Sequence, residues 1–220
     1  MILKCIQKAQ QSTKRGSAPM LPIGIMFILA MVIFTNYIYR RQMLQYNYSN
    51  IETCLIDSLL AGAVVNVNEL ARSGNIVIDD VVSAGYTETY FDRSYSIFKS
   101  AIKNNLGLND AWEFAEYRDF EGVLVINEYV VYNYYELETG FQIVEISTNG
   151  ILKQSIAHPV NEKVYVEANG TTKEITETSV YAKITFNQHL MNRISWMESL
   201  SDSMMTGTYS LQRLVAVTDR

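Results

Sequence analysis

The side chains that most often carry chemistry, histidine and cysteine, are scarce in this sequence. There are two of each: His158, His189, Cys5 and Cys54. Neither histidine has another histidine or a cysteine one helical turn away or across a short turn, so a zinc site would need carboxylates from scattered positions. We interpret both histidines as surface residues and expect no metal site.

Other signatures of catalysis are missing from the sequence as well. It contains no glycine-rich phosphate loop and no Gly-x-Ser-x-Gly nucleophile motif. Asp79 and Asp80 are adjacent acids, which is typical of a solvated turn, and they lack the ligand spacing of a calcium loop. No set of residues is arranged for general acid–base or nucleophilic catalysis. We therefore expect a protein that is not an enzyme and binds no cofactor.

Charge is divided unevenly along the chain. Residues 1–41 contain six basic residues and no acidic one, whereas the whole chain contains 18 basic and 23 acidic residues. Subtracting the six leaves 12 basic and 23 acidic residues for 42–220, a net charge of −11. Such a surface repels phosphate groups, so we do not expect nucleic acid as a partner.

One segment is long and apolar enough to cross a membrane. No charged residue occurs between Arg15 and Arg40. An apolar helix of about 20 residues spans the ~30 Å hydrocarbon core of a bilayer, and a lone segment inside lipid must be helical. Tyr37 and Tyr39 beside Arg40 match the aromatic and basic anchors of a membrane interface. The alternative, a core helix of a globular protein, rarely runs this far without a charge. We predict a single span with membrane lipid as its partner.

The basic residues also predict the orientation of this span. Four of them precede it and two follow it, and a short basic N-terminus usually stays in the cytoplasm. A cleaved secretory signal fits less well, because the apolar run exceeds the ~7–15 residues of such signals. We expect a cell-membrane protein with a cytoplasmic N-terminus and an extracytoplasmic C-terminal domain.

The helix is expected to continue beyond the membrane. Residues 40–72 contain no proline and a single glycine, Gly62, and Ser73-Gly74 favours a helix end. Apolar residues recur every three or four positions, the pattern of one helical face. This face either packs on the domain that comes after it, which is the simpler interpretation, or forms a helix assembly surface. Its members are Ile51, Leu55, Leu59, Ala63, Val67 and Leu70.

The remainder of the chain reads as a helix followed by short strands. Apolar and aromatic residues at helical spacing predict a helix over 87–106. Asn149-Gly150 between two apolar runs is a good two-residue hairpin signal, and Asn169-Gly170-Thr171 is expected to form a turn before the run at 180–186. Strands are expected over 76–78, 122–126, 129–135, 141–146, 150–156, 163–166, 180–186 and 209–217, and 187–208 is left unassigned. The predicted class is α+β: a long N-terminal transmembrane helix extending into an ectodomain with a second helix and a small antiparallel β-sheet.

The junction before the span has a recognisable form. Lys14-Arg15-Gly16-Ser17 stands directly before the apolar run, behind a polar and basic leader. This arrangement resembles the processing site of type IV prepilins, in which a prepilin peptidase cuts after the glycine, here Gly16, and the mature chain begins at Ser17. The fifth residue after this junction is Leu21, where most major pilins carry glutamate.

Several parts of the chain share this resemblance. The leader, the apolar helix, residues 52–69 with Gly74-Asn75 and the segment 76–78, and the late segments 178–186 and 209–219 together resemble TadE-like minor pilins of tight-adherence (Tad, Flp-type) loci. The resemblance covers most of the chain in architecture, although its motifs are diffuse. It implies a minor pilin, a pseudopilin or a component of the assembly complex, with other pilin-like subunits, membrane assembly proteins and a prepilin peptidase as partners.

These features divide the chain into four parts. We expect a basic cytoplasmic leader over 1–16, a transmembrane helix over 17–41, an extracytoplasmic amphipathic helix over 42–72 and an α+β ectodomain over 73–220. A second interpretation keeps this layout but makes the chain a single-pass accessory or ligand-binding subunit of a larger membrane complex, such as a conjugation apparatus, that never enters a filament. Processing after Gly16 distinguishes the two, because an ordinary anchor has no reason to be cut on its cytoplasmic side.

Overall fold

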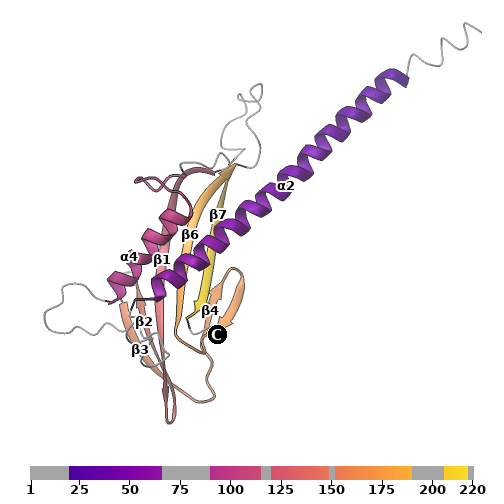
Figure 1. Ribbon diagram of the computed structural model, residues 1–220. Helices are drawn as coiled ribbons and strands as arrows, with labels where there is room; N and C mark the ends of the chain where they lie inside the picture. Colours follow the sequence, from indigo (N-terminus) through magenta and orange to yellow (C-terminus); the bar gives the residue numbers. More distant parts are fainter. Residues whose placement is uncertain (1–19, 66–89, 115–119, 149–151, 190–205, 218–220) are drawn as a thin grey trace, which may run out of the picture. The chain divides into compact units, whose positions relative to one another are not determined.

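The computed structural model describes residues 20–65, 90–114, 120–148, 152–189 and 206–217 (Figure 1). By its internal contacts the chain divides into two units, Met1–Asn47 and Tyr48–Arg220. The class is α+β, as predicted, with a long apolar N-terminal helix, a second helix and antiparallel sheets of five and two strands among the described residues. The elements are α2 (Met20–Ala63), α4 (Tyr90–Asn105), β1 (Phe120–Leu137), β2 (Gly140–Ser147), β3 (Leu152–Pro159), β4 (Tyr165–Ala168), β5 (Thr171–Glu174), β6 (Ser179–His189) and β7 (Thr206–Ala216).

Helix α2 ends earlier than the sequence analysis expected. It stops at Ala63, and Val64 and Val65 are not helical, while residues 66–72 lie outside the described part of the chain. Gly62 has a poor helix propensity, and the two β-branched valines lower it further. The expectation of a regular helix as far as residue 72 is therefore wrong at Val64 and Val65.

Five antiparallel strands form the main sheet in the order β3-β2-β1-β6-β7. The central strand, β1, pairs with β2 on one side and β6 on the other. The sequence predicts two strands here, on either side of Asn127-Glu128, but the structure has one strand with a register irregularity between Ile126 and Glu128. An irregularity of this kind bends a strand without ending it, so the polar pair interrupts the sequence pattern and not the strand.

A separate two-stranded ribbon is formed by β4 and β5. Its turn, Asn169-Gly170, has left-handed backbone angles at both residues, with φ of 55° and 73°. These are typical of a type I′ hairpin turn, for which Asn-Gly is a preferred pair. The sequence predicts the turn but not strand β5, because the four side chains of β5 are polar and exposed and give no alternating apolar signal.

The main sheet has an apolar core on each of its two faces. On the first, which we call the helix face, α4 and the part of α2 within Tyr48–Arg220 pack against the strands (Figure 1). The second, the ribbon face, is covered by the β4–β5 ribbon and the chain that continues from it, through the buried side chains of Ala168 and Ile175. Both faces of the central strand are therefore covered, as a small domain without disulfides requires.

Candidate functional site

The largest exposed apolar surface among the described residues belongs to the N-terminal part of α2. Every residue over 22–39 is exposed, and side chains such as Met26 and Ile33 are 71 % and 70 % exposed. Within the described residues this helix is long and apolar enough to cross a membrane. Exposed apolar surfaces of this size are typical of segments that contact lipid or another protein.

Two polar side chains in this segment donate hydrogen bonds back to the helix itself. The Thr35 hydroxyl donates to the Met31 carbonyl at 2.8 Å, and the Asn36 amide donates to the Val32 carbonyl at 2.9 Å. Such back-bonding removes unpaired donors from an apolar surface, where each would be costly. These bonds lower the cost of placing the Thr35 hydroxyl and one Asn36 N–H in an apolar environment.

The six residues of the expected helix assembly face fall into two groups. Four of them, Ile51, Leu55, Leu59 and Ala63, are at most 1 % exposed and belong to the core on the helix face. The other two, Val67 and Leu70, lie outside the described residues, as do Gly16 and Ser17 of the leader. The four described side chains pack within their own domain, which corresponds to the simpler of the two interpretations of this face.

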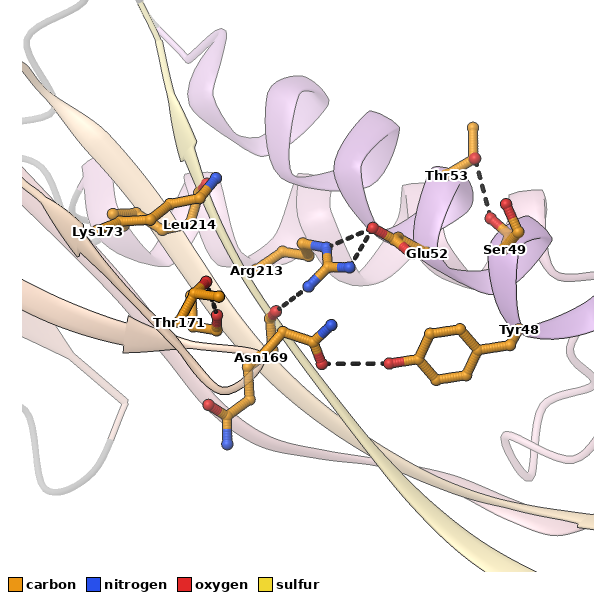
Figure 2. A network of polar contacts seen from close by, with 11 residues as sticks. Tyr48, Ser49, Glu52, Thr53, Asn169, Thr171, Lys173, Arg213 and Leu214 are labelled. Carbon is orange, nitrogen blue, oxygen red and sulfur yellow. Dashed lines mark hydrogen bonds and ion pairs between the residues drawn. The ribbon is translucent and has the colours of Figure 1, made fainter. Parts of the chain in front are cut away.

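A polar network joins α2 to the last strand and to the ribbon turn (Figure 2). Arg213 Nε donates to Glu52 Oε1 at 2.8 Å, Nη2 contacts the same oxygen, and Nη1 donates to the Gln212 carbonyl at 2.9 Å. The Asn169 amide lies 3.2 Å from the Tyr48 hydroxyl. With its oxygen turned toward Arg213, that amide accepts from Nη1 at 2.8 Å and Nη2 at 3.1 Å, and its nitrogen donates to Tyr48. The guanidinium thus connects three separate elements.

Sequence reasoning could not have found this network. Glu52 and Arg213 are 161 positions apart, and neither lies in a local pattern that names the other. The side chains are 30 % and 15 % exposed, so the pair is partly shielded from water and worth more than a typical surface ion pair. The planar, forked donors of the arginine match the oxygens around it, an arrangement that lysine cannot reproduce.

We expect Arg213→Lys to lower the free energy of unfolding of the domain by about 1–2 kcal/mol, because charge-assisted hydrogen bonds to Glu52 and Asn169 are lost. Lys183→Arg is a matched control in the neighbouring strand β6, since it changes the same two residue types without touching the network. Urea unfolding of the detergent-solubilised chain, followed by near-UV circular dichroism, measures both. Equal midpoints for Arg213→Lys and the parent would show that the network does not hold α2 to the domain.

A second, fully buried network lies where α2 crosses α4. Ser94 Oγ donates to the Gly62 carbonyl at 2.7 Å and lies 2.6 Å from the Tyr129 hydroxyl. Since the single serine proton goes to the carbonyl, the tyrosine must be the donor of the second bond. Burial raises the pKa of Tyr129 well above its ordinary value, so this proton is retained. The Phe98 ring stacks on Tyr129 with 4.8 Å between centroids.

Gly62 makes this crossing possible. A Cβ atom on residue 62 would lie 2.8 Å from the Tyr129 hydroxyl, 3.0 Å from Phe98 Cβ and 3.2 Å from the Ser94 carbonyl oxygen. All three distances are shorter than ordinary van der Waals contacts. The only glycine between residues 40 and 72 is therefore a packing requirement of the domain.

The carboxylates of Glu128 and Glu145 share the ribbon face with the buried phenols of Tyr132 and Tyr181. Burial, and after it the negative charge of Glu128, raises the pKa of Glu145. Burial, followed by Glu128 and Glu167, raises the pKa of Tyr181 to about 12. The pKa of the Tyr132 phenol is shifted in the same direction, mainly by burial. Burial thus makes ionisation of Glu145, Tyr132 and Tyr181 less favourable than in water, as is usual for ionisable side chains at the margin of an apolar core.

The histidine and cysteine candidates are dispersed. His158 differs from the expected surface residue: its side chain is only 12 % exposed, stacks on Phe141 and lies 3.0 Å from Glu162. Cys54 is partly buried, is a free thiol, and its pKa is raised chiefly by burial. Within the described residues no three metal-binding side chains are grouped together.

An open groove of about 580 Å³ runs beside the Arg213 network, between α2, the ribbon and β7. Its lining is mixed, with Ile56 and Leu214 beside Lys173 and Arg213. Each of these cations has a hydrogen-bond partner within the domain: Lys173 Nζ donates to the Leu214 carbonyl at 3.4 Å, and Arg213 Nε donates to Glu52. A groove this open, with a mixed lining, does not identify a particular ligand.

No family model matches this chain, and neither a curated protein nor a solved structure matches it. Its function is therefore inferred from the arrangement of the described residues. They combine an exposed apolar helical segment with a compact domain whose polar networks hold the end of that same helix in place.

Proposed function

We propose that this chain is a membrane-anchored minor pilin or pseudopilin-like structural component of a Tad or type IV-like pilus or secretion apparatus. The proposal is supported by one observation above all: the helix whose residues 22–39 are exposed and apolar ends within the core of an α+β domain, where Leu55 and Leu59 are fully buried. A subunit built this way can leave lipid by packing its apolar segment against other helices.

The same proposal covers location and partners. The N-terminus lies in the cytoplasm, the span lies in the cell membrane, and the domain lies outside, in accordance with the basic residues that precede the span. Other pilin-like subunits, membrane assembly proteins and a prepilin peptidase are its partners, and it has no catalytic role. The alternative, a single-pass accessory or ligand-binding subunit of a larger membrane complex, uses the same anchor and differs in that the leader stays attached.

Co-expression with a prepilin peptidase is the decisive test. We expect the intact mass of the membrane-extracted chain to correspond to a start at Ser17 when the peptidase is present and at Met1 when it is absent. Gly16→Val should abolish the change, because the peptidase cuts after a glycine in the proteins this leader resembles. Retention of residues 1–16 under both conditions would contradict the pilin-like function and favour the accessory subunit. A cut beyond Tyr39 would indicate a secreted protein and contradict both.

A further inference from the structure

The two edge strands of the main sheet, β3 and β7, differ in how well their outer backbone groups are covered. On β7, the Leu214 carbonyl accepts from Lys173 and the Gln212 carbonyl accepts from Arg213. For Thr208 and Ser210, further up β7, the described residues provide no bond to an outward-facing backbone group. Natural sheets usually protect such edges with charges, bulges or covering elements. We call the segment of β7 around Thr208 and Ser210 the upper part of β7; within the described part of the chain it lacks this protection.

Within the described residues, strand β3 has an uncovered stretch of outer backbone at Ser155 and Ala157. Leu137 and Gly140 close a two-residue hairpin and form a hydrogen-bonded pair between β1 and β2. Along each antiparallel strand, successive residues direct their backbone N–H and C=O groups to opposite sides. Counting from Gly140 through the β2–β3 register, the backbone groups of Lys153, Ser155 and Ala157 therefore point away from β2. The next outward position is Pro159, and its carbonyl accepts a hydrogen bond from the Glu162 amide. No described residue bonds to the outward backbone groups of Ser155 and Ala157. Both edges thus present backbone donors and acceptors that the described residues leave uncovered.

The distribution of charge favours the two edge strands as the place where two copies of this domain can meet. Residues 42–220 carry a net charge of −11, so two copies of this domain repel each other over most of their surfaces. Neither β3 nor β7 contains an acidic residue, and each contains one basic residue, Lys153 or Arg213. By contrast, β1 alone contains three glutamates. The edges are therefore places where two copies can meet without opposing carboxylates.

Strand direction decides which edges can meet. Because five antiparallel strands form the sheet, its two edge strands run in the same direction. Pairing β3 with β3 of a second copy in antiparallel fashion requires a two-fold axis normal to the sheet, which reverses the α2 segment that packs on it. Pairing β3 with β7 leaves that segment pointing the same way in both copies. The second arrangement also uses both uncovered edges of each copy, whereas pairing β3 with β3 leaves β7 unpaired in both copies.

We propose that β3 of one copy of this chain pairs, in parallel, with the upper part of β7 of a second copy. Ser210 then lies opposite Ile156, with its amide and carbonyl bonded to Ser155 and Ala157. Thr208 lies opposite Gln154 in the same way. Only a few backbone bonds form, so the contact is weak in solution and depends on the confinement of both copies to one membrane. In this respect the inference rests on the proposed membrane anchorage.

The proposed register can be tested with a matched control, because it determines which side chains lie on the same face of the sheet. Ile156 faces the ribbon side of the sheet, because it pairs with Ile143, and Ser210 faces the same side, because it pairs with Thr185. Ser155 pairs with Val144 and faces the helix side. Cysteines at 156 and 210 therefore come within disulfide distance across the contact, whereas cysteines at 155 and 210 lie on opposite faces.

The test uses full-length chains with two different tags, co-expressed in a background in which Cys5 and Cys54 are alanine. In intact membranes under mild oxidation, we expect Ile156→Cys to cross-link to Ser210→Cys at least five-fold more than Ser155→Cys does. Ile156→Cys alone should give no more dimer than an exposed control, Val123→Cys. Equal yields for the two pairs, no link at all, or a dominant Ile156→Cys homodimer would each overturn the proposal. Leader processing is measured by intact mass, and cross-linking is measured by gel mobility. The proposed function and the proposed β3–β7 contact can therefore be contradicted independently.

Discussion

Replacing Leu59 by alanine is expected to lower the free energy of unfolding of the domain by about 2–5 kcal/mol. The side chain is fully buried on the helix face, so its removal loses apolar burial and leaves a cavity that neighbouring side chains fill only in part. Domains of this size are stable by only about 5–15 kcal/mol. The variant should therefore unfold at a much lower urea concentration, measured on the detergent-solubilised chain by near-UV circular dichroism.

The adjacent residue provides the control for this experiment. Leu60 is on the same helix and is 38 % exposed, so Leu60→Ala should change the unfolding free energy by less than about 1 kcal/mol, as is usual for exposed positions. If Leu59→Ala behaved like Leu60→Ala and instead reduced association between chains, the buried residues of α2 would have to be reassigned to an assembly surface.

Gly62→Ala is expected to destabilise the domain by about 1–3 kcal/mol, even though alanine favours a helix by roughly 1 kcal/mol over glycine. The added methyl group would lie 2.8 Å from the Tyr129 hydroxyl. Gly24→Ala is the matched control on the same helix, because nothing lies within 4 Å of the corresponding position. It should leave the unfolding free energy of the domain unchanged.

A double variant tests the cause of this effect. Tyr129→Phe removes the atom nearest to the new methyl group and also the hydrogen bond to Ser94, so alone it should cost about 1 kcal/mol. Combined with Gly62→Ala it should cost clearly less than the sum of the two single changes, because the two sites are in contact. Strict additivity would mean that the close approach of Gly62 to Tyr129 is not the source of the destabilisation.

Local patterns in the sequence identified the elements that local forces determine. The apolar stripe containing Leu55 and Leu59 was assigned to a helix because its spacing repeats every turn, and Asn169-Gly170 was assigned to a turn because few other pairs tolerate its backbone. The boundaries were less accurate. Val64 and Val65 leave the helix and Asn127-Glu128 stays within a strand, because tertiary contacts outweigh intrinsic preferences there.

The parts that sequence reasoning missed depend on residues far apart in the chain. Arg213 finds Glu52 only because β7 lies at the sheet edge nearest to α2, and no property of either residue encodes that position. The partial burial of His158 likewise results from the pairing of β2 with β3, which stacks the imidazole on Phe141. Such contacts are set by topology and register, which composition and periodicity do not specify.

The pairing of β1 with β6, and of α2 with Arg213, affects how the domain folds while the chain is being synthesised. Ribosomes complete α2 first, but the strand that supplies Arg213 is among the last segments to emerge. Until then Leu55 and Leu59 have only part of their final surroundings. Contacts this distant in sequence make folding slow and leave apolar surface exposed during synthesis. The nascent domain is therefore vulnerable until its C-terminal strand arrives, and truncation before residue 206 should leave a chain that proteases remove.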